Sequence, residues 1–129
     1  MDDFEKELIQ DFFAEANQLI EATEQALLTL EKDKNNINLI NEIFRLAHTF
    51  KGSSRAVGFG QVAEFTHEIE NLIMQLQKGK LKISSNLITL LLECNDHARV
   101  MIEGLMADIE AKFDSTKLIA AIKKSLENK

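Results

Sequence analysis

Apolar side chains recur along this chain at intervals of three and four residues. That spacing is typical of helices that bury one face. Five such segments can be distinguished, over about residues 3–31, 38–57, 61–77, 85–112 and 115–127. No stretch alternates apolar and polar residues as a half-buried strand would. The pattern therefore predicts an all-α protein.

The apolar stripe of the first segment is expected to begin at Phe4 and Leu8, and that of the fourth to reach Ile109. Polar or glycine-containing connections separate the segments, and a serine at 84 or 85 can cap the fourth. Because these connections are short, successive helices should be antiparallel neighbours. We expect one domain over residues 1–129, an antiparallel up-down four-helix bundle with a fifth C-terminal helix.

Composition narrows the classes of partner. The formal net charge is −6, which disfavours a nucleic acid or an anionic membrane as partner. Cys94 is the single cysteine, so no intramolecular disulfide can form. No apolar run approaches the length of about 20 residues needed to span a bilayer, and the first residues do not resemble a signal peptide. We therefore expect a cytoplasmic protein without membrane insertion.

The stretch HTFKGSSRAVGFG, residues 48–60, concentrates basic and glycine residues in an otherwise acidic helical chain. His48, Lys51 and Gly52 share one helical face, at spacings of three and four. A nucleotide-binding P-loop is excluded, because the lysine precedes the glycine and no strand comes before either. Glycine is costly inside a helix, so Gly52 suggests a place where a partner must come close.

A carboxylate on the third segment is expected to meet this face. His48 lies eleven residues before a turn centred near residue 59, and Glu70 lies eleven residues after it. In an antiparallel pair the two side chains should be at the same height, so Glu70 can accept a hydrogen bond from one imidazole nitrogen. That bond would fix the tautomer and leave the other nitrogen nucleophilic toward a phosphoryl group. Lys51 would offset the incoming negative charge.

Each residue also has an ordinary interpretation when it is taken alone. A histidine at the edge of an apolar stripe is more often structural, Lys51 and Glu70 could be surface charges, and Gly52 could allow close helix packing. His97 and Cys94 are expected to be structural, because His97 has no evident acidic partner and Cys94 lies within the apolar stripe.

The segment HTFKGSSRAVGF, residues 48–59, resembles the signature H-x-x-K-G-[SA] of the histidine-containing phosphotransfer (HPt) domain. The opening DDFEKELIQDFFAEANQLIEATEQALLTLE and the later VGFGQVAEFTHEIENLI extend the likeness to the N-terminal phosphotransfer domains of chemotaxis histidine kinases of the CheA type. Together with the extended fourth helix and the fifth, these features cover almost the whole chain.

The resemblance implies that His48 is the phosphorylated residue, that Glu70 orients its ring, and that Lys51 and His67 complete a polar network. It implies that the ATP-binding domain of a histidine kinase supplies the phosphoryl group. A response regulator, such as the motor regulator or the methylesterase of chemotaxis, would receive it on an aspartate. ATP and Mg²⁺ would belong to those partners, with no cofactor in this domain. The chain would be the phosphoacceptor part of a histidine protein kinase, and a monomer when isolated.

Two other functions compete with this one. Glu64 and His67 form an E-x-x-H pair like those of di-iron bundles. The second such pair is absent, since Cys94 and Arg45 stand three residues before the other histidines. A helical adaptor that docks through residues 59–65 and carries out no chemistry is the remaining alternative.

Overall fold

The structure, a computed structural model, describes residues 1–127, which form five helices and no strand. The helices are α1 (Asp3–Lys32), α2 (Ile37–Ala56), α3 (Gly60–Gln77), α4 (Ser85–Ala107) and α5 (Thr116–Glu127). The predicted all-α class is confirmed, and each predicted start lies within one residue of the observed one.

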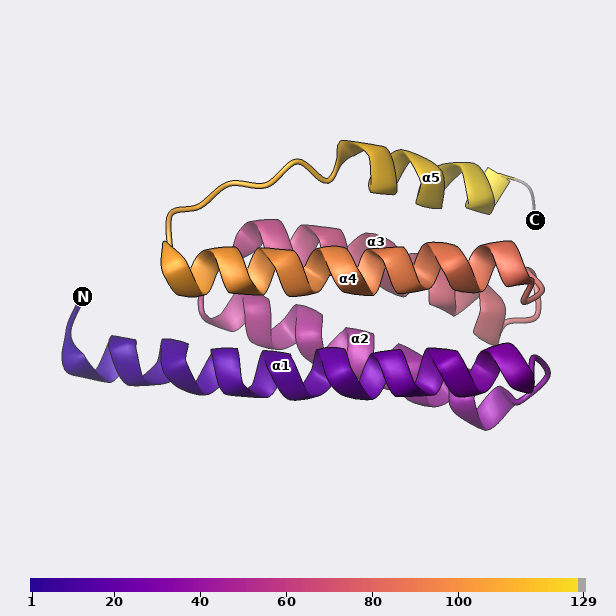
Figure 1. Cartoon of the computed structure of the whole chain (residues 1–129), viewed down its shortest axis with the longest axis horizontal. Helices are drawn as coiled ribbons and strands as arrows, with labels where there is room; N and C mark the ends of the chain where they lie inside the picture. Colours follow the sequence, from indigo (N-terminus) through magenta and orange to yellow (C-terminus); the bar gives the residue numbers. More distant parts are fainter. Residues whose placement is uncertain (128–129) are drawn as a thin grey trace.

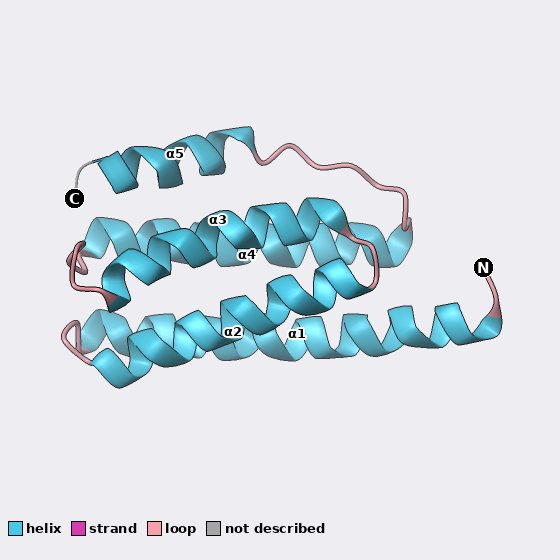
Figure 2. Cartoon of the chain, turned by 180° about the vertical axis from the view of Figure 1, so that it is seen from behind, coloured by secondary structure: helices cyan, strands magenta, loops and turns pink. Residues whose placement is uncertain are grey.

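The first four helices run alternately up and down and close into a ring (Figure 1). α1 packs against α2 and α4, and α3 packs against α2 and α4. α5 returns along the outside of this bundle and contacts both α3 and α4 (Figure 2). The fold is therefore the predicted antiparallel four-helix bundle with a fifth helix beside it.

Local chemistry explains where the helices begin and turn. The side chains of Asp2, Asn36 and Ser84 each accept a hydrogen bond from a backbone N–H in the first turn of α1, α2 and α4. Gly58 and Gly79 have φ values of +85° and +72°, a region that side chains disfavour, and they end α2 and α3. The turn at Gly58 sets the antiparallel pairing of α2 with α3.

All four bundle helices and Ile122 of α5 contribute to one hydrophobic core. At one end of the bundle this core is aromatic. The ring of Phe59, from the α2–α3 turn, lies 5.5 Å from that of Phe12 and 5.8 Å from that of Phe13, between ring centroids. These contacts tie the turn that follows α2 to α1.

Two expectations about helix ends were wrong. Phe4 and Leu8 are 69% and 45% exposed, because the first turns of α1 extend beyond the other helices (Figure 1). α4 ends at Ala107 instead of near residue 112, since Asp108 is extended with φ −154° and ψ 107°. Ile109 is consequently 43% exposed and does not continue the α4 stripe.

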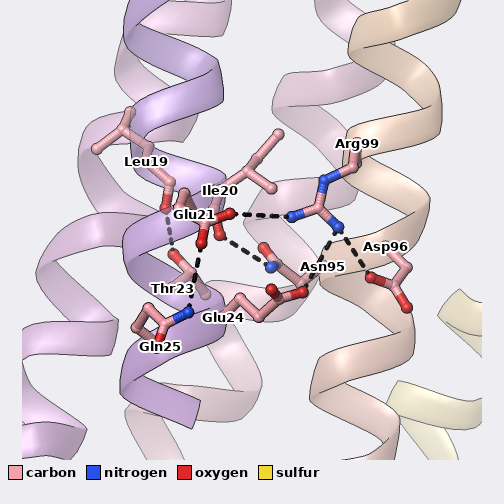
Figure 3. Close-up of polar contacts among 9 residues, drawn as sticks. All are labelled: Leu19, Ile20, Glu21, Thr23, Glu24, Gln25, Asn95, Asp96 and Arg99. Carbon is pink, nitrogen blue, oxygen red and sulfur yellow. Dashed lines mark hydrogen bonds and ion pairs between the residues drawn. The ribbon is translucent and has the colours of Figure 1, made fainter. Parts of the chain in front are cut away.

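Polar contacts join α1 and α4, which are far apart in sequence (Figure 3). The buried Asn95 side-chain amide donates a hydrogen bond of 3.0 Å to the carbonyl oxygen of Ile20. Beside it, Arg99 lies within 4 Å of carboxylate oxygens of Glu21 and Glu24 on α1. The interface between α1 and α4, which closes the ring of helices and is called the seam below, is thus partly polar.

Across residues 1–127, none of the helices combines the length and the apolar character that a membrane crossing requires.

Candidate functional site

His48 lies on the outer side of α2, with 65% of its side chain exposed. Its ring is stacked on that of Phe44, one turn earlier, with 6.2 Å between centroids and 14° between planes. Phe44 was not among the predicted site residues. Its contact with His48 could have been anticipated from the four-residue spacing, which places two helical side chains side by side.

Glu70 of α3 contacts this imidazole on its Nδ1 side. Its Oε2 atom is 2.6 Å from Nδ1 of His48, and its side chain is only 5% exposed. A proton on Nδ1 is therefore donated to a carboxylate, and Nε2 is left with its lone pair. The structure thus contains the His48–Glu70 hydrogen bond predicted from the equal distances to the turn.

Lys51 completes the same cluster, but from an unexpected side. Its Nζ atom donates to Oε1 of Glu70 at 2.6 Å, and its side chain is 13% exposed. The ammonium group is therefore engaged with the carboxylate instead of standing free beside Nε2. The sequence placed Lys51 on the correct face and did not identify Glu70 as its partner.

The pKa of Glu70 reflects these contacts. Burial alone raises the pKa of a carboxyl group, because it penalises the charged form. Here the hydrogen bonds from Lys51 and His48 outweigh burial, and the net pKa is below the ordinary 4.5. Glu70 is therefore an anion at neutral pH and can only accept hydrogen bonds.

His67, one turn before Glu70 on α3, lies at the margin of the cluster. Its Nδ1 atom is 3.8 Å from Oε1 of Glu70, which is beyond hydrogen-bond distance, and its side chain is 48% exposed. The predicted network thus includes His67 only as a neighbouring charge when it is protonated. The structure brings four predicted residues together: His48, Lys51, His67 and Glu70.

Gly52, the fifth predicted residue, is exposed on α2. A Cβ atom built there would meet nothing within 4 Å. Close helix packing, one of the two interpretations of this glycine, is therefore not its reason. The surface beside His48 and Lys51 is left shallow, which a docking partner could use.

His97 and Cys94 occupy structural positions on α4, as expected. His97 Nε2 lies 2.8 Å from Oγ of Ser115, and its ring packs edge-on against Phe65. Burial lowers the pKa of His97, and the nearby Asp114 carboxylate opposes this only in part. Burial raises the pKa of the Cys94 thiol to about 12, so this cysteine is not a reactive thiolate at neutral pH.

Residues 1–127 contain no group of three or more His, Cys, Asp or Glu side chains arranged to hold a metal ion. Within this part of the chain the E-x-x-H pair of Glu64 and His67 therefore has no partners that would make it a di-iron site.

Chemically, the site presents one exposed nucleophilic nitrogen that is braced by a buried carboxylate. None of the described residues hydrogen-bonds Nε2 of His48, which faces away from Glu70. Fixing Nδ1–H against an anion favours the tautomer whose Nε2 lone pair points to solvent, and it stabilises positive charge that develops on the ring. The geometry suits a group that accepts and releases an electrophile brought by another molecule.

Comparisons with known proteins agree with this chemistry. Residues 7–101 match the family model described as the Hpt domain. The chain is 37% identical over 109 residues to "Chemotaxis protein CheA" of Listeria monocytogenes, covering 84% of this chain and 18% of that protein. It is 39% identical over 97 residues to the protein of the same name from Borreliella burgdorferi, covering 75% of this chain and 11% of that one. The chain thus spans less than a fifth of the length of these relatives.

Two solved structures are similar over most of the chain. A phosphorylated P1 domain of CheA3 in complex with CheY6 from R. sphaeroides has a TM-score of 0.85 and 26% identity, covering 95% of this chain and 97% of that one. The CheA phosphotransferase domain from Thermotoga maritima has a TM-score of 0.74 and 30% identity, covering 78% of this chain and 95% of that one.

Proposed function

Since the chain belongs to the Hpt domain family, we propose that it carries a phosphoryl group on Nε2 of His48 in chemotaxis signalling. The observation that carries this proposal is the 2.6 Å contact between Nδ1 of His48 and the buried Glu70, because it leaves Nε2 as the exposed nucleophile. The similarity to a phosphorylated P1 domain supports the same assignment.

In the proposed reaction, Nε2 attacks the γ-phosphorus of ATP held by the ATP-binding domain of a histidine kinase. An N–P bond forms while the bond from the γ-phosphorus to the β–γ bridging oxygen breaks, and ADP leaves. Nδ1 keeps its proton throughout. Glu70 accepts the hydrogen bond from that proton, so positive charge that builds up on the ring is stabilised by the carboxylate.

The phosphoryl group then passes to an aspartate carboxylate of a response regulator. An O–P bond forms, the N–P bond breaks, and its electron pair returns to Nε2. We propose the motor regulator and the methylesterase of chemotaxis as recipients. The similar P1 domain of R. sphaeroides, whose structure is a complex with CheY6, supports a regulator of this kind. Exposed Gly52 would let its surface approach His48 closely.

Lys51 and His67 act through charge in this proposal. In the resting state Lys51 neutralises Glu70 at 2.6 Å, which keeps a lone buried carboxylate from repelling an incoming phosphate. When the phosphoryl group is bound, Lys51 adds positive charge to its surroundings, and His67 would add to it only in its charged form. Neither residue touches the reacting nitrogen.

The chain is the phosphoacceptor part of the reaction and depends on partners for the rest. We propose that ATP and Mg²⁺ are bound by the kinase and regulator domains, and that this domain needs no cofactor. We further propose that the isolated domain is a monomer, since a single chain holds every residue of the cluster. A cytoplasmic location accords with the proposed partners.

Labelling with radioactive phosphate tests the proposal. The purified domain is incubated with a kinase core of the CheA type and [γ-³²P]ATP, and the label is tested for acid lability and base stability. We expect acid-labile label on the wild type and none on His48→Gln. His97→Gln is the matched control, because it keeps His48 and Glu70, and it should still carry acid-labile label whatever its rate. Continued labelling of a folded His48→Gln protein would favour the adaptor alternative.

A further inference from the structure

The segment between α4 and α5, residues 108–115, is held against α3 by one side chain. Gln61, in the first turn of α3, donates from Nε2 to the carbonyl oxygen of Ala111 at 3.0 Å. Its Oε1 atom accepts a hydrogen bond from the backbone N–H of Phe113 at 2.9 Å. Both the N–H and the oxygen of the Gln61 amide thus hydrogen-bond to the backbone of this segment, which fixes it against α3.

Phe113 anchors the same segment on α4. A Cβ atom added to Gly104 would lie 2.6 Å from two carbons of the Phe113 ring, so the ring occupies the place of a side chain on α4. A side chain at position 104 would therefore force the Phe113 ring to move. The two contacts connect the N-terminal end of α3 to the C-terminal end of α4 through the connecting segment.

Further contacts continue the connection along α5. His97 of α4 reaches Ser115 at 2.8 Å, and its ring packs on Phe65 of α3 with 4.9 Å between centroids. Ile122 of α5 is fully buried. We name residues 108–127, together with Gln61 and Gly104, the clamp.

The clamp acts on the helix that carries Glu70. α3 lies between α2 on one side and α5 on the other, and its contact with α4 is less extensive than its contact with α5 (Figure 2). The most extensive contact of α3 is its direct packing on α2, and α5 supports α3 from the other side at least as much as α4 does. The hydrogen bond from His48 to Glu70 crosses the α2–α3 interface at 2.6 Å, and a shift of α3 by about 1 Å would take it outside hydrogen-bond distance.

We propose that Gln61 and Phe113 are positioning residues for the phosphoryl acceptor: through the clamp they hold α3 so that Glu70 meets Nδ1 of His48. The inference rests on the proposed function for its effect on rate, but its structural part concerns only the tautomer of His48. Neither residue touches the imidazole, and their action is through the position of α3.

Three variants weaken the clamp from different sides. Gln61→Leu removes both hydrogen bonds to the segment, and Phe113→Ala removes the ring from Gly104. Gly104→Ala displaces the Phe113 ring, while the sequence of α3, including Gln61, and Phe113 itself are not substituted. Phe113→Leu is the conservative control, because a branched apolar side chain can still cover Gly104. Val100→Ala is the surface control on α4, since Val100 is exposed.

The primary measurement is the ¹⁵N NMR spectrum of His48, which reports the share of each tautomer without requiring phosphorylation. We expect the wild type and both controls to hold the proton on Nδ1, and the three clamp variants to show a mixture. We also expect the clamp variants to be phosphorylated about tenfold more slowly, less than the roughly hundredfold loss for a full 1 Å misplacement.

Rapid exchange of the α5 amides would show that a variant has loosened the clamp. If such a variant keeps the wild-type tautomer and a phosphorylation rate within twofold of wild type, the proposal is overturned and the proposed function still stands. If instead the wild-type domain takes no label, the proposed function fails while the tautomer measurement still tests the clamp. If Gln61→Leu or Phe113→Ala does not fold, Gly104→Ala and hydrogen exchange decide the question.

Discussion

Glu70 is a nearly buried carboxylate that accepts hydrogen bonds from two cations or potential cations, His48 and Lys51. Lys51 is itself only 13% exposed. At the residue scale this makes Glu70 both a chemical and a structural group. Its removal leaves a mostly buried ammonium without its partner, and so the cost falls on folding as well as on phosphoryl transfer.

We predict that Glu70→Ala slows phosphorylation of His48 and lowers the free energy of unfolding by about 1–3 kcal/mol, because Lys51 loses its buried acceptor. Urea denaturation and labelling by a kinase core measure the two effects. Glu64→Ala is the matched control, since Glu64 is an exposed acid on the same helix, and it should change neither. Equal stability of the two variants would contradict the structural part of the prediction.

The lowered pKa of Glu70 predicts a pH dependence with a definite sign. A carboxyl group whose pKa is depressed by folding stabilises the folded state fully above its ordinary pKa of 4.5, and this stabilisation is lost as the pH falls through the folded pKa. The free energy of unfolding should therefore decrease on acidification below about 4.5. Glu70→Gln should show a smaller decrease over this range in denaturation curves at pH 7, 5, 4 and 3. Parallel curves would assign the acid sensitivity to other carboxylates.

Gly52→Leu should separate stability from partner docking. No atom lies within 4 Å of the added Cβ, and leucine favours helix over glycine, so the free energy of unfolding should rise by about 0.5–1 kcal/mol. The larger side chain beside His48 should slow transfer to a regulator severalfold. Thermal unfolding and single-turnover transfer measure the two changes. If transfer proceeds at the wild-type rate, partners do not approach over Gly52.

At the scale of elements, α5 depends on few deeply buried side chains. Ile122 is its one fully buried residue among those described, and Leu118, Ile119 and Leu126 are partly buried against the core. We predict that Ile122→Ala lowers the free energy of unfolding by about 2 kcal/mol, the low end for such a truncation, because α5 can detach before the bundle unfolds. Hydrogen exchange should show α5 amides exchanging faster than those of α1. Lys124→Ala, on the exposed side of α5, should have little effect on either.

At the scale of the whole molecule, the ring of helices is closed by the seam between α1 and α4 (Figure 3). Asn95 is buried there and bonded to Ile20, whereas Arg99 is about a third exposed and its partner Glu21 is 62% exposed. Exposed ion pairs contribute little, while a lost buried hydrogen bond costs more. The seam therefore depends on Asn95 more than on the charges around it.

We predict that Asn95→Ala lowers the free energy of unfolding by about 1–3 kcal/mol, and that Arg99→Met lowers it by less than about 1 kcal/mol. Raising the salt concentration should reduce the Arg99 effect and leave the Asn95 effect unchanged, because salt screens only exposed charges effectively. Denaturation at low and high salt measures both. A larger loss for Arg99→Met would mean that the charge cluster stabilises the seam.

Much of the fold could be predicted because helix formation and capping are local. The spacing of apolar residues identified five helices, glycine-containing connections separated them, and Ser84 marked the start of the fourth. The predictions failed where distant parts decide burial. Phe4 and Leu8 belong to the apolar stripe of α1, yet they are exposed because the first turns of α1 extend beyond the other described helices (Figure 1). α4 ends at Ala107, where Asp108 is extended, and the chain beyond it bonds to Gln61 of α3.

The sequence by itself determined the all-helical class, the antiparallel order and the equal heights of His48 and Glu70, since each follows from periodicity and the length of a single turn. Only the tertiary structure decided that Lys51 bonds to Glu70, that Phe113 seats on Gly104, and that α3 is held between α2 and α5. The physical reason is that the helical periodicity of a sequence shows only on which face of its helix a residue lies. Which atom it meets there depends on how far each helix is rotated and shifted against neighbours that may come from anywhere in the chain.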